Sequence, residues 1–155
     1  MFSINANMIQ KQRLEMQLNL FREKRFGFLH PEVEFPKKDQ ALQILTDDVT
    51  SELAYGGAKG GGKSRVGTDW QVLSALAYPG IKQFIGREER TRLMASTYKT
   101  FLNTCSDLKI PSWAWKLDGK YNIITWYNGS LIDLLNFAFE PSDPLYERFG
   151  SQEYT

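Results

Sequence analysis

Residues 57–64 have the composition and spacing of a loop that binds phosphate. They match the pattern G-x-x-x-x-G-K-[ST], with a lysine and a serine in the last two positions. Glycines let such a loop turn successive backbone N–H groups toward a phosphate and approach it closely. The lysine reaches the β- and γ-phosphates, and the final hydroxyl coordinates Mg²⁺. The pattern therefore predicts a site for a nucleoside triphosphate and Mg²⁺, formed by Gly57, Ala58, Lys59, Gly60, Gly61, Gly62, Lys63 and Ser64.

The sequence on both sides of this loop predicts the elements that would position it. Residues 52–55 form a short apolar run, which predicts a strand directly before the loop. Apolar residues at helical spacing follow the loop, namely Val66, Trp70, Leu73 and Ala77. A helix in this place would aim its N-terminal N–H groups and partial positive charge at the phosphates. The alternative interpretation is a flexible glycine-rich surface loop.

The pattern beyond the loop predicts an α/β domain. The helix should stop at the Tyr-Pro-Gly sequence of residues 78–80, and residues 81–85 should form a buried strand. A further amphipathic helix is expected over residues 91–102. Together these elements favour a P-loop NTPase-type sheet flanked by helices.

The last third of the chain predicts an antiparallel β-meander. Asp118-Gly119 and Asn128-Gly129 are hairpin-turn signals, because these residues tolerate the positive φ of a tight turn. They separate three runs, at residues 113–117, 120–127 and 130–137. From residue 141 onward the sequence is rich in turn-forming residues. Five aromatic residues in this third either stack on nucleic-acid bases or, as we expect, pack across the strands: Trp113, Trp115, Tyr121, Trp126 and Tyr127.

The first third of the chain predicts helices outside the nucleotide site. Residues 8–26 have one apolar helical face, which either packs on the domain or binds a partner or DNA. Residues 31–36, with a proline at each end, should be extended, and residues 39–45 should form a short helix. We divide the chain into an N-terminal helical arm, residues 1–35, and a P-loop ATPase domain, residues 36–155.

Composition excludes several kinds of site. The 155 residues carry a net charge of +1, which implies no broad electrostatic attraction to nucleic acid or membrane. One cysteine, Cys105, can form neither an internal disulfide nor a cysteine metal cluster, and we expect it to be a small buried side chain. The single histidine, His30, is expected in a loop. With no long apolar run and no secretory pattern, we expect an intracellular protein.

Residues 52–64 resemble the Walker A region of phage terminase large subunits, the ATP-driven motors that package DNA. Lys59 stands where many members of that family carry arginine. The resemblance implies that Lys59 senses or stabilises the γ-phosphate together with Lys63, although lysine lacks the bidentate fork of arginine. It also implies that ATP and Mg²⁺ are the ligands.

Further segments resemble the same family in the same order. Residues 36–45 are similar to its adenine-recognition stretch, with Gln40 as the base-reading residue, although a solvated helix position is the alternative. Residues 128–132 resemble its Asn-Gly-Ser hairpin, and residues 146–155 resemble the stretch before Walker B. The resemblance implies double-stranded DNA, a portal protein and a small terminase subunit as partners, a homo-oligomeric ring, and the cytoplasm of an infected host cell.

Three arginines follow the second predicted strand, namely Arg87, Arg90 and Arg92. In the family resemblance this region carries an arginine that contacts a neighbour's nucleotide or DNA. For each of the three, a solvated or salt-bridged arginine is the alternative that we favour.

A Walker B strand, which is four apolar residues followed by Asp-Glu, is the expected source of catalytic acids. Residues 137–140 are the nearest match but lack the aspartate. By the family pattern Walker B would follow residue 155, so we interpret the chain as the N-terminal part of the ATPase domain. Its sheet should then have an open edge and the chain should be marginally stable. A small P-loop phosphotransferase and a non-catalytic nucleotide-binding fragment are the alternative functions.

Overall fold

The computed structural model describes the chain at residues 2–29, 36–47, 49–50, 52–56 and 62–154. Within these ranges the fold is mixed α/β: three helices precede the first strand, and a further helical segment separates that strand from three consecutive strands. The helices are α1 (Phe2–Arg22), α2 (Pro36–Leu45), α3 (Lys63–Ala77), α4 (Arg90–Arg92) and α5 (Lys99–Asp107), and a π-helical segment (Leu93–Tyr98) joins the last two. The strands are β1 (Lys82–Arg87), β2 (Trp115–Asp118), β3 (Ile123–Trp126) and β4 (Leu131–Asn136), and short 3-10 turns lie at Phe26–Phe28, Ser112–Ala114 and Glu147–Phe149.

The strands form one four-stranded mixed sheet with the order β1-β4-β3-β2. β1 and β4 are parallel, whereas β4, β3 and β2 pair antiparallel, so the predicted meander is confirmed. Gly129 has the expected positive φ, 85°, in the second hairpin. In the first hairpin the positive φ falls on Asn122 (57°), and Asp118 instead accepts hydrogen bonds from the backbone N–H groups of residues 120 and 121.

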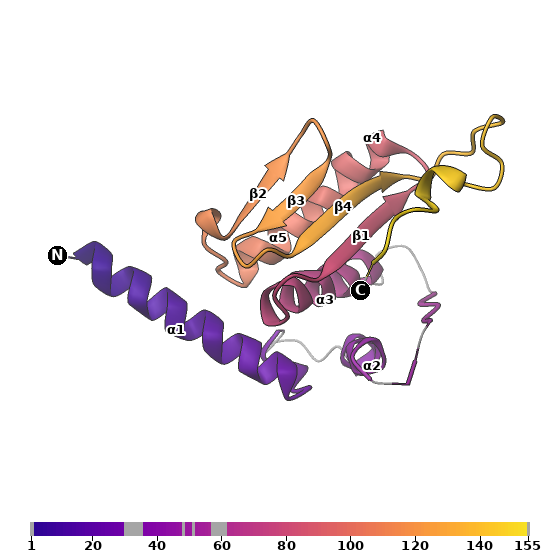
Figure 1. The fold of residues 1–155 in the computed structure, drawn as a ribbon. Helices are drawn as coiled ribbons and strands as arrows, with labels where there is room; N and C mark the ends of the chain where they lie inside the picture. Colours follow the sequence, from indigo (N-terminus) through magenta and orange to yellow (C-terminus); the bar gives the residue numbers. More distant parts are fainter. Residues whose placement is uncertain (1, 30–35, 48, 51, 57–61, 155) are drawn as a thin grey trace.

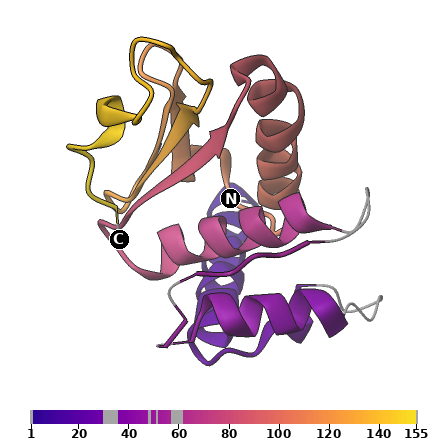
Figure 2. The same cartoon turned by 90° about the vertical axis from the view of Figure 1, so that its right-hand side faces the viewer.

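The helices α3 and α5 cover one face of the sheet (Figures 1 and 2). Strand residues on this face are buried, among them Ile85, Ile124 and Ile132. The opposite face is crossed by the C-terminal tail, where the Tyr154 ring lies 4.8 Å from that of Phe84 and its hydroxyl donates to Asp133 at 2.9 Å. The sheet is therefore covered by helices on one side and by irregular chain on the other.

Helix α1 shares its core with the rest of the fold. Leu14, Leu18 and Phe21 are buried in the same apolar cluster as residues of α3, so the helix packs on the domain along this face. Arg22 donates to the carbonyl of Ala77 at 3.1 Å, which satisfies a group at the end of α3 and places a positive charge at its negative pole. The exposed part of α1 includes Met8, Ile9 and Met16.

The strand predicted at residues 52–55 is wrong, because these residues do not join the sheet of the described chain. Their side chains do alternate in burial, and Leu53 and Tyr55 pack against the helical core. In Figure 2 the segment passes α3 on the side where α2 lies. An alternating pattern reports one buried side of an extended segment, whereas a strand also needs a hydrogen-bonding neighbour.

The other predicted elements are confirmed with shifted ends. The helix after the loop ends at Ala77, immediately before the Tyr-Pro-Gly sequence. The second predicted strand extends to Arg87, two residues beyond the expected end, and the helix predicted over residues 91–102 continues to Asp107 through the π-helical segment. Of the stretch predicted to be extended, residues 31–36, the first five residues lie outside the described residues, as does the loop residue His30. The prediction is wrong at Pro36, which is the first residue of α2.

Candidate nucleotide-binding site

The candidate site is built at the N-terminus of α3. Gly62 precedes this helix with φ of 77° and ψ of 9°, a left-handed conformation that glycine adopts without strain. Its carbonyl accepts the hydrogen bond of the Val66 N–H at 3.0 Å, which closes the first turn. Lys63 and Ser64 are exposed in that turn, and it contains no acidic residue. The exposed lysine, the hydroxyl and the helix N-terminus therefore lie together.

The motif is only partly within the described residues. Gly62, Lys63 and Ser64 are described, whereas Gly57, Ala58, Lys59, Gly60 and Gly61 lie outside the described residues. Gln40 is exposed on α2, a helix that packs against α3. The structure thus brings the helix of Gln40 beside the helix of Lys63.

Lys38, which no motif of the sequence singled out, lies at the same place. The side chain of Lys38 reaches the space in front of Gly62, where a Cβ built on this glycine would lie 2.4 Å from Cε and 3.1 Å from Nζ. Lys38 precedes Ala41 and Leu42 by three and four residues, and both are buried. This spacing is the sequence signal that places Lys38 on the side of α2 that faces the core.

The three arginines predicted near the site follow strand β1. Because β1 returns antiparallel to α3 after a short turn, its carboxyl end and the N-terminus of α3 lie toward the same end of the domain (Figure 1). All three arginines are exposed. Arg92 pairs with Glu89 at 3.0 Å, Arg90 donates to the Asn122 side chain at 2.8 Å, and Arg87 donates to the Arg92 carbonyl at 3.3 Å. Arg92 is therefore salt-bridged, and Arg87 and Arg90 are exposed to solvent, in agreement with the favoured alternative.

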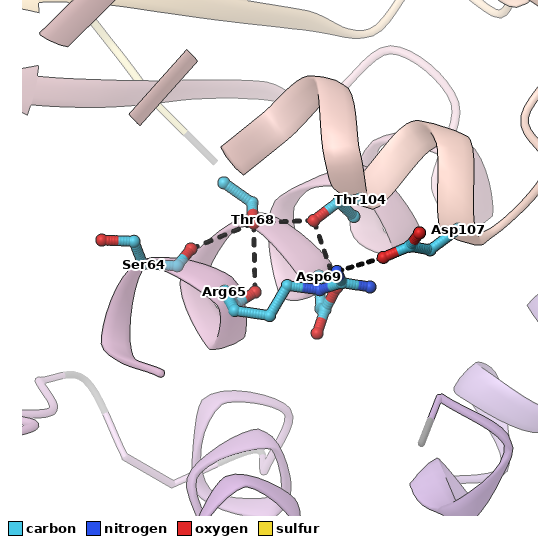
Figure 3. Close-up of polar contacts among 6 residues, drawn as sticks. All are labelled: Ser64, Arg65, Thr68, Asp69, Thr104 and Asp107. Carbon is cyan, nitrogen blue, oxygen red and sulfur yellow. Dashed lines mark hydrogen bonds and ion pairs between the residues drawn. The ribbon is translucent and has the colours of Figure 1, made fainter. Parts of the chain in front are cut away.

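Behind the exposed first turn, α3 is fixed to α5 by a polar network (Figure 3). Asp69 is fully buried and accepts a hydrogen bond from Arg65 Nε at 2.7 Å and one from the Thr104 hydroxyl at 3.3 Å. Arg65 also donates to Asp107 on α5. Burial alone would lower the pKa of Arg65, but the hydrogen bonds and charges of Asp107 and Asp69 raise it. The guanidinium is therefore held charged and is directed away from the candidate site.

Thr68 ties this network to the first turn of α3. Its hydroxyl lies 3.0 Å from the carbonyl oxygen of Ser64 and 2.9 Å from the hydroxyl of Thr104 (Figure 3). Thr68 and Thr104 are both buried. The backbone of Ser64 is thus fixed from the interior, while its side chain remains exposed.

Glu140 is the acidic residue of the nearest Walker B match. Glu140 lies outside the strands, is exposed, and lies 3.8 Å from Arg148. Arg148 also binds Asp143 at 2.7 Å and the Ala138 carbonyl at 2.7 Å, so it anchors the tail. Among the residues that the structure describes, no group of three or more His, Cys, Asp or Glu side chains is placed to hold a metal ion.

The aromatic residues of the meander mostly pack against one another. Trp115 and Trp126 are paired across β2 and β3, and the ring of Phe101 on α5 meets them edge-on at 5.1 and 6.0 Å. The packing interpretation is confirmed for these two. Trp113 and Tyr127 form a separate, exposed pair with ring centroids 5.4 Å apart, and Tyr121 is also exposed.

Cys105 is buried on α5, as expected for a single cysteine, and burial raises the pKa of its thiol from 9.0 to about 12. Over the described part of the chain, helices long and apolar enough to cross a bilayer are absent.

No protein-family model, curated protein sequence or solved structure matches this chain.

Proposed function

We propose that the chain binds ATP and Mg²⁺ at the N-terminus of α3. The observation that carries this proposal is the pairing of a G-x-x-x-x-G-K-[ST] sequence with a 15-residue helix whose first turn presents Lys63 and Ser64. Backbone N–H groups of the loop and of the first turn surround the phosphates. Lys63 neutralises the γ-phosphate, and the Ser64 hydroxyl is a ligand of Mg²⁺. In this proposal Gly57, Ala58, Lys59, Gly60 and Gly61 complete the cradle.

The chemistry of these residues is electrostatic. When the γ-phosphate is transferred, negative charge spreads over its oxygens, and a fixed lysine stabilises that charge. We propose that Lys59 adds a second positive charge there, as the terminase resemblance implies. Gln40 is proposed to contact the base.

The wider proposal is a motor ATPase of the terminase type, in which ATP turnover drives the translocation of double-stranded DNA. It is supported by the family-like order of segments around the loop and by the clustering of three arginines after β1, at the same end of the domain. A portal protein, a small terminase subunit and further copies of the chain would be its partners in the cytoplasm of an infected host cell. The P-loop architecture of the sheet is part of this proposal.

A non-catalytic nucleotide-binding function is the second candidate. It is favoured by Glu140, the nearest acid to a Walker B position, which lies beside Arg148 instead of at the end of a strand. Such a chain binds nucleotide without placing a base on the attacking water.

Calorimetric titration of the full chain with Mg-ATP tests the first step. We expect saturable binding that is lost, by at least about tenfold, in Lys63→Ala, because the γ-phosphate loses its cation. Lys99→Ala is the matched control, since it removes an exposed lysine from α5 and should bind as the wild type does. Equal affinity of the two variants would reject the proposed site.

Phosphate release, measured with and without linear double-stranded DNA, separates the two candidate functions. Turnover stimulated by DNA is expected for the motor. Binding without turnover under both conditions would favour the non-catalytic function.

A further inference from the structure

A cavity of about 350 Å³ lies beside the edge strand β1, away from the candidate nucleotide site. Its wall is formed by the ends of α1 and α2, the C-terminal half of α3 and the start of β1 (Figure 1). Ser74, which lies in this wall, follows Lys63 on α3 at a distance of about 16 Å along the helix axis. The volume falls in the range of small-molecule sites, which begins at roughly 300 Å³.

The wall of this cavity is mainly aromatic and aliphatic. Phe21, Trp70 and Tyr78 contribute rings, and Leu45 and Ile81 contribute aliphatic side chains. The other described residues in the wall are a threonine, a serine and a glutamine, so none of the described wall residues is an acid, lysine, arginine or histidine. Such a wall favours a neutral, planar ligand, because flat rings pack on aromatic side chains and a buried charge would find no counter-ion.

One polar side chain in the wall has an unsatisfied amide. Gln83 lies on the same face of β1 as the buried Ile85, is only 4% exposed, and has its Oε1 buried without a hydrogen-bond partner among the described residues. Gln71 of α3 differs, because its amide donates to the Phe84 carbonyl at 2.7 Å. Buried amides in folded proteins are normally paired, so the orphaned oxygen of Gln83 indicates a partner from outside the chain.

The part of α3 that forms the wall is held in place by side chains from other elements. The Ala75 carbonyl accepts hydrogen bonds from Asn128 Nδ2 and from the Ser130 hydroxyl, both at 2.8 Å. The Ala77 carbonyl accepts one from Arg22 at 3.1 Å. These bonds fix the end of α3 to α1 and to the turn before β4, so this wall is formed by the fold itself and little ordering is needed on binding.

We propose that the cavity binds a small, neutral, planar heterocycle that donates an N–H group to Gln83. A cyclic amide suits the site best, because its adjacent N–H and C=O groups match the acceptor and the donor of the glutamine carboxamide. The terminal torsion of glutamine is soft, so the carboxamide can turn its oxygen toward the ligand. This site is separate from the nucleotide site that we propose at the N-terminus of α3, and neither requires the other.

Heteronuclear NMR of the full, isotopically labelled chain reads this cavity through the indole N–H signal of Trp70. The other tryptophans, Trp113, Trp115 and Trp126, lie outside the wall and serve as internal controls. The probe is isoquinolone, a planar bicyclic lactam, and its N-methyl derivative lacks the donor. We expect isoquinolone to shift the Trp70 signal saturably, and the N-methyl derivative to bind about three- to tenfold more weakly.

Gln83→Met and Gln17→Met form a matched pair of variants. Gln17 is also buried with an unpartnered Oε1, but it lies on α1 outside the cavity wall. We expect Gln83→Met to weaken isoquinolone binding by about three- to tenfold and Gln17→Met to bind as the wild type does. Thermal unfolding tests a purely structural role. Gln83→Met should be at least as stable as wild type, because it removes an unsatisfied buried amide.

Three outcomes would overturn this proposal: no Trp70 shift up to the solubility limit of isoquinolone, equal shifts of all the tryptophan signals, or an equal loss of affinity in Gln17→Met. Lys63→Ala distinguishes the two sites. This variant should lose Mg-ATP and keep the Trp70 response to isoquinolone. If it loses both, the response arises at the nucleotide site and the cavity is rejected as a separate site. If wild type responds to isoquinolone and does not bind Mg-ATP, the cavity site stands and the proposed function fails.

Discussion

The first two turns of α3 have two sides that use charge in different ways. On the side facing α5, the charges are paired: Arg65 lies between the fully buried Asp69 and the carboxylate of Asp107 (Figure 3). On the side facing α2, Lys63 is exposed and the half-buried side chain of Lys38 reaches toward Gly62 at the helix N-terminus. The first arrangement joins α3 to α5, and the second lies where we propose that phosphate binds.

The difference shows that the role of a charged residue in the first turns of α3 depends on the groups around it. Arg65 and Lys63 are two residues apart in the same turn, and both are cations. Arg65 donates hydrogen bonds to the buried carboxylate of Asp69 on α3 and to Asp107 on α5. Substitutions on the two sides should therefore affect different measurements.

The largest effect on stability is expected from Asp69→Ala. It removes a fully buried carboxylate and leaves Arg65, whose side chain is only 19% exposed, without one of its two carboxylate partners. Removing one partner of a buried ion pair costs about 3 kcal/mol of unfolding free energy. Urea unfolding measures this loss. Asp107→Ala is the control, because that side chain is 59% exposed and should cost about 1 kcal/mol or less.

The same variant also tests the separation of the two sides. Folded Asp69→Ala should bind ATP within about twofold of wild type, since Asp69 lies on the α5 side of the helix. A large loss of affinity with unchanged stability would show that the buried network belongs to the ligand site.

Smaller effects on stability, opposite in sign to each other, are expected from alanine substitutions at two glycines of this region. Gly62→Ala forces alanine to φ of 77° and displaces Lys38, so it should lower the unfolding free energy by about 1–2 kcal/mol. Gly67→Ala is the matched control inside α3. Nothing lies within 4 Å of its Cβ position, and alanine is the better helix former, so it should raise stability by up to about 1 kcal/mol. Thermal unfolding at neutral pH measures both, and equal effects would remove the special role of Gly62.

The local pattern of the sequence was enough to predict most elements. The spacing of Val66, Leu73 and Ala77, with Tyr-Pro-Gly after them, predicts α3 and its end because both signals lie within one segment. The Asn128-Gly129 signal predicts the second hairpin for the same reason. These features depend on the backbone preferences of neighbouring residues and not on distant contacts.

Features that depend on packing between segments were predicted less well. Residues 52–55 have the alternating burial of a strand, but a strand also needs a hydrogen-bonding partner from elsewhere in the chain. Among the described residues β1 pairs only with β4, so residues 52–55 are not part of the sheet. The position of Lys38 beside Gly62 was not predicted, because it depends on α2 packing against α3 and on the absence of a Cβ in glycine. The network of Asp69 and Thr104 joins residues 35 positions apart, which no local pattern encodes.

A third prediction concerns how the stability of the fold depends on pH through Cys105, which is buried on α5. Burial raises the pKa of Cys105 to about 12, so the thiol stays protonated in the folded state while the unfolded thiol ionises above 9.0. The folded state then binds more protons than the unfolded state, and stability decreases as pH rises from about 9 toward 12. Relative to Cys105→Ala, wild type should lose about 1.4 kcal/mol between pH 8 and pH 10. Urea unfolding of the pair measures this, and parallel curves would mean that the thiol is accessible.

The smallest effect is expected from Gln40→Ala, and it tests the α2 side directly. Gln40 is exposed and two positions after Lys38, which places it on the opposite side of the helix from the Gly62 contact. The base must then extend around α2 to reach the glutamine, and loss of one amide hydrogen bond should weaken ATP binding by about two- to threefold. Competition between ATP and GTP provides the decisive measurement. If Gln40→Ala weakens ATP and leaves GTP unchanged, base reading by Gln40 is supported. If neither nucleotide is affected, Gln40 is a solvated position of α2 and does not read the base.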